Sequence, residues 1–205
     1  MTTDRRKFCL KLRKAIHGLK QAPLEWYERL KAWLVKTGFL ACIMDPCVFS
    51  LQKPSELWLY IHMDNIAIFG SKIEPFKREI SLEFNIKDIG VADLLLGVRI
   101  GHSADHVSLE QQHFTEFLLD IYGMSDCRPV VTPLLPNKHL SPATDNNMSA
   151  LNSLGISYCS AIGSIKYLST ATCPDLSFAV SSLSRFPERP GLLNWKAFLH
   201  VLRYL

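Results

Sequence analysis

The feature that most constrains this chain is a pair of short apolar strands that meet at a polar turn. Residues 57–61 (Leu-Trp-Leu-Tyr-Ile) and 66–69 (Ile-Ala-Ile-Phe) are rich in β-branched and aromatic side chains, and the stretch between them contains Asp64 and Asn65. This pattern is typical of a β-hairpin. We therefore expect a buried hairpin whose tip presents the carboxylate of Asp64.

Hydrophobic periodicity predicts helices and further strands on both sides of this hairpin. A first helix is expected between Pro23, which suits a first helical turn, and Gly38, which ends a helix. The other expected helices cover residues 74–84, 112–122, 158–169, 174–186 and 195–205, and the other expected strands cover 47–51, 94–100 and 107–109. Residues 125–156 hold four prolines and are predicted to form a linker or a long irregular loop. The predicted fold class is α+β.

The charge of the chain is concentrated at its N-terminus. Residues 1–36 hold ten Lys and Arg against three Asp and Glu, a net charge of +7, whereas the rest of the chain carries −3. A basic segment on a nearly neutral body is expected either to meet an anionic partner such as nucleic acid or to form a solvated tail. Charge alone leaves both interpretations open.

Composition and the length of apolar runs restrict the class of protein further. With 48% hydrophobic residues, the chain is expected to fold. No apolar run approaches the roughly 18–20 residues that span a membrane, and no apolar signal core follows the basic N-terminus. The six cysteines form no C-x-x-C pair, and none has zinc-ligand spacing from a histidine. We predict a cytoplasmic or nuclear protein without membrane contact or structural zinc.

Two polar features could support chemistry. Asp64 at a hairpin tip is well placed to bind a divalent metal ion for two-metal nucleotidyl transfer, but Asp-Asn is also ordinary turn chemistry. Lys20 and Gln21 precede the helix that Pro23 opens. There they could contact phosphate or a base, or they could form a plain loop before a helix.

Several motifs match one protein family in the same order. They are residues 11–23 (Lys-Leu-Arg-Lys-Ala-Ile-His-Gly-Leu-Lys-Gln-Ala-Pro), 45–49 (Asp-Pro-Cys-Val-Phe), 87–90 (Lys-Asp-Ile-Gly), 95–100 (Leu-Leu-Gly-Val-Arg-Ile) and 202–205 (Leu-Arg-Tyr-Leu). Over its whole length the chain resembles the reverse transcriptase of copia-type LTR retrotransposons. Residues 62–65 stand where that family has the Tyr-Val-Asp-Asp motif of its catalytic hairpin.

This resemblance implies roles for particular residues. Lys20, Gln21 and Pro23 would lie in the block that borders the incoming nucleotide and the template. Asp64 would be a ligand of Mg²⁺ or Mn²⁺ and match the first aspartate of the catalytic pair, and Asn65 would occupy the position of the second.

The resemblance also implies a primer side, a fold and a set of partners. Lys87, Asp88 and Gly90 would form a turn near the primer end. The fold would be a partial reverse-transcriptase palm, made of antiparallel hairpins backed by helices, followed by a mostly helical thumb or connection region. The partners would be an RNA or DNA template-primer and dNTPs.

The catalytic motif departs from the family pattern. Asn65 offers a neutral carbonyl where the family has an anion, and hard divalent metals prefer charged oxygen. The family's other metal-binding aspartate is expected on a strand before the first residue of this chain. With one carboxylate left of three, we expect the chain to be catalytically inactive.

The predicted organisation has three parts: a partial palm at 1–124, the proline-rich linker at 125–156, and a helical thumb or connection region at 157–205 that leads toward a missing RNase H. The expected function is that of an inactive reverse transcriptase fragment, an RNA-directed DNA polymerase by ancestry. Two alternatives stay open. The chain could be a nucleic-acid-binding remnant without chemistry, or an active subunit completed by a partner chain that supplies the missing palm strand.

Overall fold

The computed structural model describes residues 19, 21–52, 56–136 and 139–205. The chain forms two compact units, an N-terminal unit up to Gly90 and a C-terminal unit from Val91 to Leu205. Helices and small antiparallel sheets in these units confirm the predicted α+β class. None of the described helices is long and apolar enough to cross a lipid bilayer.

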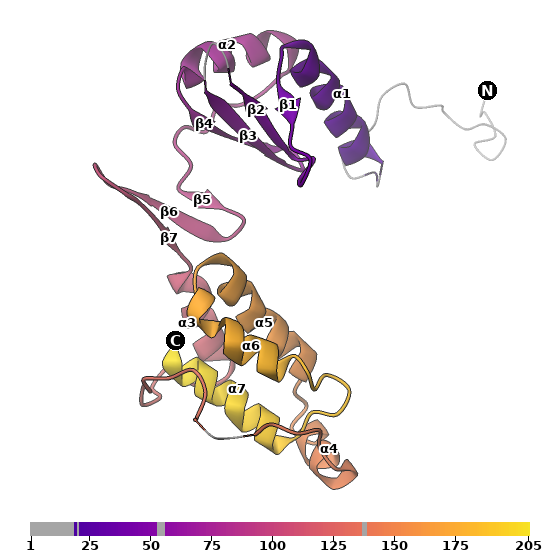
Figure 1. The fold of residues 1–205 in the computed structure, drawn as a ribbon, viewed down its shortest axis with the longest axis vertical. Coiled ribbons are helices and arrows are strands. Elements are labelled where there is room, and N and C mark those ends of the chain that lie inside the picture. The colour runs from indigo at the N-terminus through magenta and orange to yellow at the C-terminus, as the bar shows by residue number, and fades with distance from the viewer. Residues whose placement is uncertain (1–18, 20, 53–55, 137–138) are drawn as a thin grey trace, which may run out of the picture. The chain divides into compact units, whose positions relative to one another are not determined.

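The N-terminal unit is a four-stranded antiparallel sheet covered by two helices (Figure 1). The strands lie in the order β1-β2-β3-β4. Their bounds are β1 Leu40–Ala41, β2 Val48–Leu51, β3 Leu57–His62 and β4 Asn65–Gly70, and the helices are α1 Ala22–Lys36 and α2 Ile73–Glu83.

Buried and exposed side chains alternate along β3, and this alternation determines which face of the sheet packs against the helices. Leu57, Leu59 and Ile61 are each at most 2% exposed, whereas Trp58, one position along, is 50% exposed. Successive side chains of a strand point to opposite faces, so one face of β3 is buried and the other is open. The buried face forms a single core with residues of both helices and β2, namely Leu30, Leu34, Phe39, Phe49, Phe76, Ile80 and Phe84.

The C-terminal unit begins with a three-stranded antiparallel sheet and continues as a helical bundle (Figure 1). The strands are β5 Leu94–Leu95, β6 Val98–His102 and β7 Val107–Glu110. The helical elements are α3 Gln112–Ile121, α4 Asp145–Asn152, α5 Tyr158–Ala171, the 3₁₀ turn η1 Pro174–Leu176, α6 Ser177–Leu183 and α7 Leu192–Tyr204.

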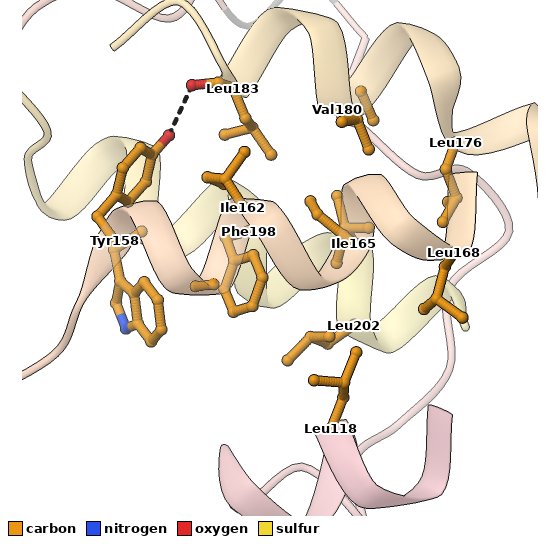
Figure 2. Packing of buried hydrophobic residues seen from close by; sticks show 14 of the residues in the cluster. Leu118, Tyr158, Ile162, Ile165, Leu168, Leu176, Val180, Leu183, Phe198 and Leu202 are labelled. Atoms are coloured by element: carbon orange, nitrogen blue, oxygen red, sulfur yellow. Dashed lines mark hydrogen bonds between the residues drawn. The ribbon is translucent and has the colours of Figure 1, made fainter. Parts of the chain in front are cut away.

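Helix α5 lies at the centre of the core of this bundle. Ile165 and Leu168 are fully buried, and they lie among Leu176 and Leu183 of the following turn and helix and Phe198 of α7 (Figure 2). Most of the buried side chains of the C-terminal unit belong to this one cluster. Helices α6 and α7 therefore both pack against α5, and the three helices share one core.

The structure corrects three boundaries that periodicity predicted. Residues 94–100 are not one strand but the tight hairpin of β5 and β6, because Leu96 and Gly97 both take positive φ values of 51° and 78°. The predicted linker contains a helix, α4, whose first residue Asp145 is ion-paired with Arg189. The predicted helix 174–186 is a 3₁₀ turn followed by the shorter α6.

The boundary between the two compact units lies at residues 90 and 91, inside the part predicted as a palm at 1–124. By contact, β5, β6, β7 and α3 therefore group with the C-terminal helices. The three-part functional division at 1–124, 125–156 and 157–205 concerns roles, not contacts, and stays a prediction.

Gly70 is the position of the N-terminal sheet least able to accept a side chain. Its φ is +119°, and a Cβ there would overlap the carbonyl oxygen of Glu56. We expect Gly70→Ala to lower the free energy of unfolding of this unit by about 3 kcal/mol, since strain and overlap add. Urea denaturation followed by tryptophan fluorescence measures this, because three of the four tryptophans lie in residues 1–90.

Gly90 supplies the matched control for this prediction. Its φ is +86°, but a Cβ added to it meets nothing within 4 Å. Gly90→Ala should therefore cost only the strain of a positive φ, about 1 kcal/mol. Equal losses in the two variants would contradict the close approach of β4 to Glu56.

Tyr158 ties α5 to the end of α6. It is 4% exposed, and its hydroxyl donates a 2.9 Å hydrogen bond to the carbonyl oxygen of Leu183 (Figure 2). Tyr158→Phe leaves that carbonyl with only the longer 3.3 Å hydrogen bond from the N–H of Phe186 and should cost about 1 kcal/mol at pH 7.

The same tyrosine predicts a pH dependence. Burial raises the pKa of the Tyr158 hydroxyl above its usual value in an unfolded chain. The unfolded state therefore loses this proton first, so the contribution of Tyr158 to stability is complete below about pH 10 and falls as the pH rises above it. Denaturation at pH 8 and at pH 10.5–11 should show the deficit of Tyr158→Phe shrinking at the higher pH. A deficit that is constant across this range would contradict the prediction.

Candidate active site

The hairpin of β3 and β4 closes through a turn of two residues. His62 pairs with Asn65, so only Met63 and Asp64 connect the strands. Met63 has a φ of 53°, a conformation that residues with a Cβ rarely adopt. Met63, Asp64 and Asn65 are all exposed. The register of the sheet thus forces a strained turn that presents the Asp64 carboxylate to solvent.

The open face of β3 beside this turn is aromatic. The rings of Tyr60 and His62 stack with their centroids 6.4 Å apart and their planes 16° apart. Trp58 follows on the same face, paired in register with Phe69 of β4, and both side chains are about half exposed. Asn65, opposite His62, lies at the end of this aromatic surface.

The turn offers one charged oxygen donor and one neutral one. Asp64 contributes a carboxylate and Asn65 an amide carbonyl, and no group of three His, Cys, Asp or Glu that could hold a metal ion occurs among the described residues. A divalent ion such as Mg²⁺ needs six oxygen ligands and is commonly held by one or two carboxylates together with substrate phosphates. The donors at the turn therefore do not fit a protein-built centre for two metal ions.

The predicted nucleotide-side residues lie at the start of α1. Gln21 is the residue before the helix, it is exposed, and its side chain makes no capping hydrogen bond. Pro23 occupies the first helical turn as expected. Lys20 lies outside the described residues. Gln21 is exposed, and no residue in the described part of the chain forms a hydrogen bond with its side-chain amide.

The predicted primer-side turn is held by Asp88. Its carboxylate accepts a 2.9 Å hydrogen bond from the backbone N–H of Gly90 and lies 2.9 Å from the ammonium of Lys77 on α2. The N–H of Gly90 first, and then Lys77, lower the pKa of the Asp88 carboxyl below its usual value. Lys87 is exposed beside this turn. Asp88 thus has a structural role at this turn.

The predicted site residues therefore form three separate groups: Asp64 and Asn65 at the hairpin tip, Gln21 and Pro23 at the start of α1, and Lys87, Asp88 and Gly90 after α2. No hydrogen bond or ion pair within the described part of the chain joins one group to another. Their assignment to nucleotide, metal and primer stays a prediction.

Sequence reasoning missed Lys77. This lysine bridges Glu74, three residues before it on α2, and Asp88, eleven residues after it. Both carboxylates raise the pKa of the Lys77 ammonium, Asp88 first. The spacing from Glu74 is visible in the sequence, but the contact with Asp88 depends on where the chain turns after α2.

Comparison with known proteins identifies the family. Residues 1–136 match the family described as reverse transcriptase (RNA-dependent DNA polymerase). No solved structure matches the chain.

Several curated relatives are retrotransposon polyproteins. The chain is 34% identical over 95% of its length to the "Retrovirus-related Pol polyprotein from transposon TNT 1-94" of Nicotiana tabacum, and 33% identical over 98% to that from transposon RE2 of Arabidopsis thaliana. It spans only 15% and 14% of these two polyproteins. It is also 30% identical, over 73% of its length, to an uncharacterised mitochondrial protein of Arabidopsis thaliana. The family match covers well over half of the chain, and the chain therefore belongs to the reverse transcriptase (RNA-dependent DNA polymerase) family of copia-type, retrovirus-related Pol polyproteins.

Proposed function

We propose that this chain is the palm and adjoining helical region of a copia-type reverse transcriptase that does not synthesise DNA by itself. The observation that carries the proposal is the pair at the hairpin tip, where Asn65 follows Asp64 in the position of a second carboxylate. The turn presents both side chains to solvent, so the proposal concerns their chemistry and not their exposure.

The cost of this alteration is large on the scale of catalysis. Two-metal nucleotidyl transfer relies on carboxylates to hold the ions that bridge the attacking and leaving oxygens. Losing one charged ligand at such a centre should raise the barrier by about 3–4 kcal/mol, or roughly 10²–10³ in rate, by analogy with the loss of one oxyanion donor. Asp64, the proposed metal ligand at this turn, supplies a single carboxylate, so it does not compensate for the charge that Asn65 lacks.

We propose that this chain retains some of the contacts that its family makes with nucleic acid. Gln21 and Pro23, with Lys20, would border nucleotide and template, and the turn at Lys87–Gly90 would lie near the primer end. Such contacts bind and orient a template-primer without any reaction, and they would operate wherever the chain meets RNA, in the cytoplasm or the nucleus.

A second candidate, a nucleic-acid-binding protein without chemistry, is favoured by the basic N-terminal segment. Residues 1–36 carry a net charge of +7. On α1, Arg29 is ion-paired with Glu83, whereas Lys36 is exposed and forms no ion pair among the described residues. Among the described residues of this segment, Lys36 is thus a cation that no ion pair neutralises, which suits a polyanion.

Primer extension tests the first proposal. With a poly(rA) template, an oligo(dT) primer and Mg²⁺ or Mn²⁺, we expect no extension above background from the chain by itself, and extension that appears in Asn65→Asp would trace the loss to this position. Background extension by the chain alone agrees with the proposal, whereas extension that appears only when a second chain is added would support the active-subunit alternative. Extension that disappears in Asp64→Ala, but not in the neighbouring control Met63→Leu, would refute the inactive assignment.

Salt-dependent binding to an RNA–DNA hybrid tests the second candidate. Each phosphate contact contributes roughly 0.9 to the slope of log affinity against log salt. Neutralising three N-terminal cations should lower that slope by about 2–3; the variants are Lys11→Gln, Arg13→Gln and Lys14→Gln. The matched control neutralises three exposed cations of the C-terminal unit and should leave the slope unchanged; its variants are Lys166→Gln, Arg185→Gln and Lys196→Gln. Affinity that does not fall as salt rises would remove the support for this candidate.

A further inference from the structure

A pocket of about 360 Å³ lies in the C-terminal unit, between α7 and the segment that follows α3. All of its described lining residues come from α7 or from residues 124–140. Sites for small molecules commonly have volumes of about 300–1,000 Å³, mostly apolar walls and a few polar groups that orient the ligand. The volume therefore suits a short ligand and is too small for a folded partner.

Apolar side chains form most of the wall of this pocket. They include Met124, Leu134, Leu135, Leu140, Leu193 and Ala197. Leu135 and Leu193 are 46% and 37% exposed, whereas Met124 and Leu140 pack against the core of the helical bundle. An apolar chain that covers these side chains would remove their exposed surface from water, which favours binding.

The polar part of the pocket is basic. Lys196, His200 and Arg203 line it from α7, and their spacings of four and three residues put them on one face of the helix. None of the described lining residues is acidic. Within the described ranges, neither Lys196 nor Arg203 forms an ion pair. The pocket thus combines an apolar wall with two positive charges that the described lining does not neutralise.

Three hydrogen bonds hold residues 128–132 against the basic face of α7. The N–H of Val130 donates to the carbonyl oxygen of Arg203 at 3.1 Å. In return, Nε of Arg203 donates to the carbonyl oxygen of Arg128 at 2.8 Å, and Nε2 of His200 donates to that of Thr132 at 3.0 Å. The wall and the basic face are therefore fixed to each other before a ligand binds, and a preformed site loses little conformational entropy on binding.

We propose that this pocket binds an amphipathic carboxylate, with its apolar chain along the leucine side chains and its carboxylate on Arg203 and Lys196. The hydrogen bond to Arg128 uses one of the five N–H donors of the Arg203 guanidinium, whose planar fork suits both oxygens of a carboxylate. A neutral chain would leave the two charges without a partner, and a small polar anion would leave the apolar wall uncovered. The pocket and the hairpin tip lie in different compact units, so this binding does not depend on the proposed function.

Titration of the full chain with octanoate tests the proposal, followed by calorimetry and by NMR chemical shifts of the backbone amides. We expect saturable binding with a dissociation constant of about 0.1–1 mM. The shift changes should centre on α7 and residues 124–140. Octan-1-ol has the same chain without the charge and should bind about tenfold more weakly. An alcohol that binds as tightly as octanoate would contradict the role of the two cations.

Two variants separate the charge from the wall. Lys196→Gln removes a charge without breaking a hydrogen bond to residues 128–132, and it should raise the dissociation constant about threefold to tenfold. Its matched control is Lys166→Gln, an exposed cation of α5 outside the pocket, which should bind octanoate like wild type. Ala197→Leu extends a side chain from the wall into the pocket and should weaken binding more than about tenfold. An amide spectrum as well dispersed as that of wild type shows that each variant folds.

Any of three results would overturn the proposal. The first is a wild-type chain that octanoate does not begin to saturate by about 10 mM. The second is a set of shift changes that lies outside α7 and residues 124–140. The third is a folded Lys196→Gln variant whose dissociation constant equals that of wild type.

Discussion

The N-terminal unit depends on the packing of one side of β3 against α1 and α2. Leu57, Leu59 and Ile61 are buried there, and their spacing of two residues leaves no freedom in the strand register. A slip of one residue would bury Trp58 and expose three aliphatic side chains. The register in turn decides that His62 meets Asn65 and that the chain must reverse in the two residues Met63 and Asp64. The candidate site is therefore a consequence of core packing several residues away.

In the C-terminal unit, the buried face that fixes the packing belongs to a helix, α5, instead of a strand. Every third or fourth residue of α5, such as Ile165 and Leu168, is fully buried, and the neighbouring elements supply Leu176, Leu183 and Phe198. Figure 2 shows these side chains converging on α5 from both sides. Helices far apart in the chain take part in this packing, because α7 packs against both α4 and α5.

The sequence predicted an element correctly where hydrophobic periodicity and turn residues indicated the same boundaries. The hairpin of β3 and β4, the helix opened by Pro23 and the start of α5 at Tyr158 all combine a strong pattern with a clear boundary. The hairpin of β5 and β6 was missed because Leu96, at a φ of 51°, gives no turn signal. Likewise, the Lys77–Asp88 ion pair is a contact between residues eleven positions apart. It depends on where the chain turns after α2, and no local sequence pattern predicts that turn.

At the candidate site, fold and chemistry are separable, and this explains how the family can be evident while Asn65 stands at the proposed position of a second carboxylate. A protein whose turn was held together by a metal ion would lose that turn with its ligands. Here the turn is held by backbone pairing and by the buried face of β3, while Asp64 and Asn65 are exposed and contribute nothing to the core. Exchanging a carboxylate for an amide at Asn65 therefore has a small effect on stability, since exposed polar substitutions are usually within about 0.5 kcal/mol. The same exchange would cost several times that amount in a reaction that needs the charge. The residues that specify the fold of this unit are thus different from those that would specify its reaction.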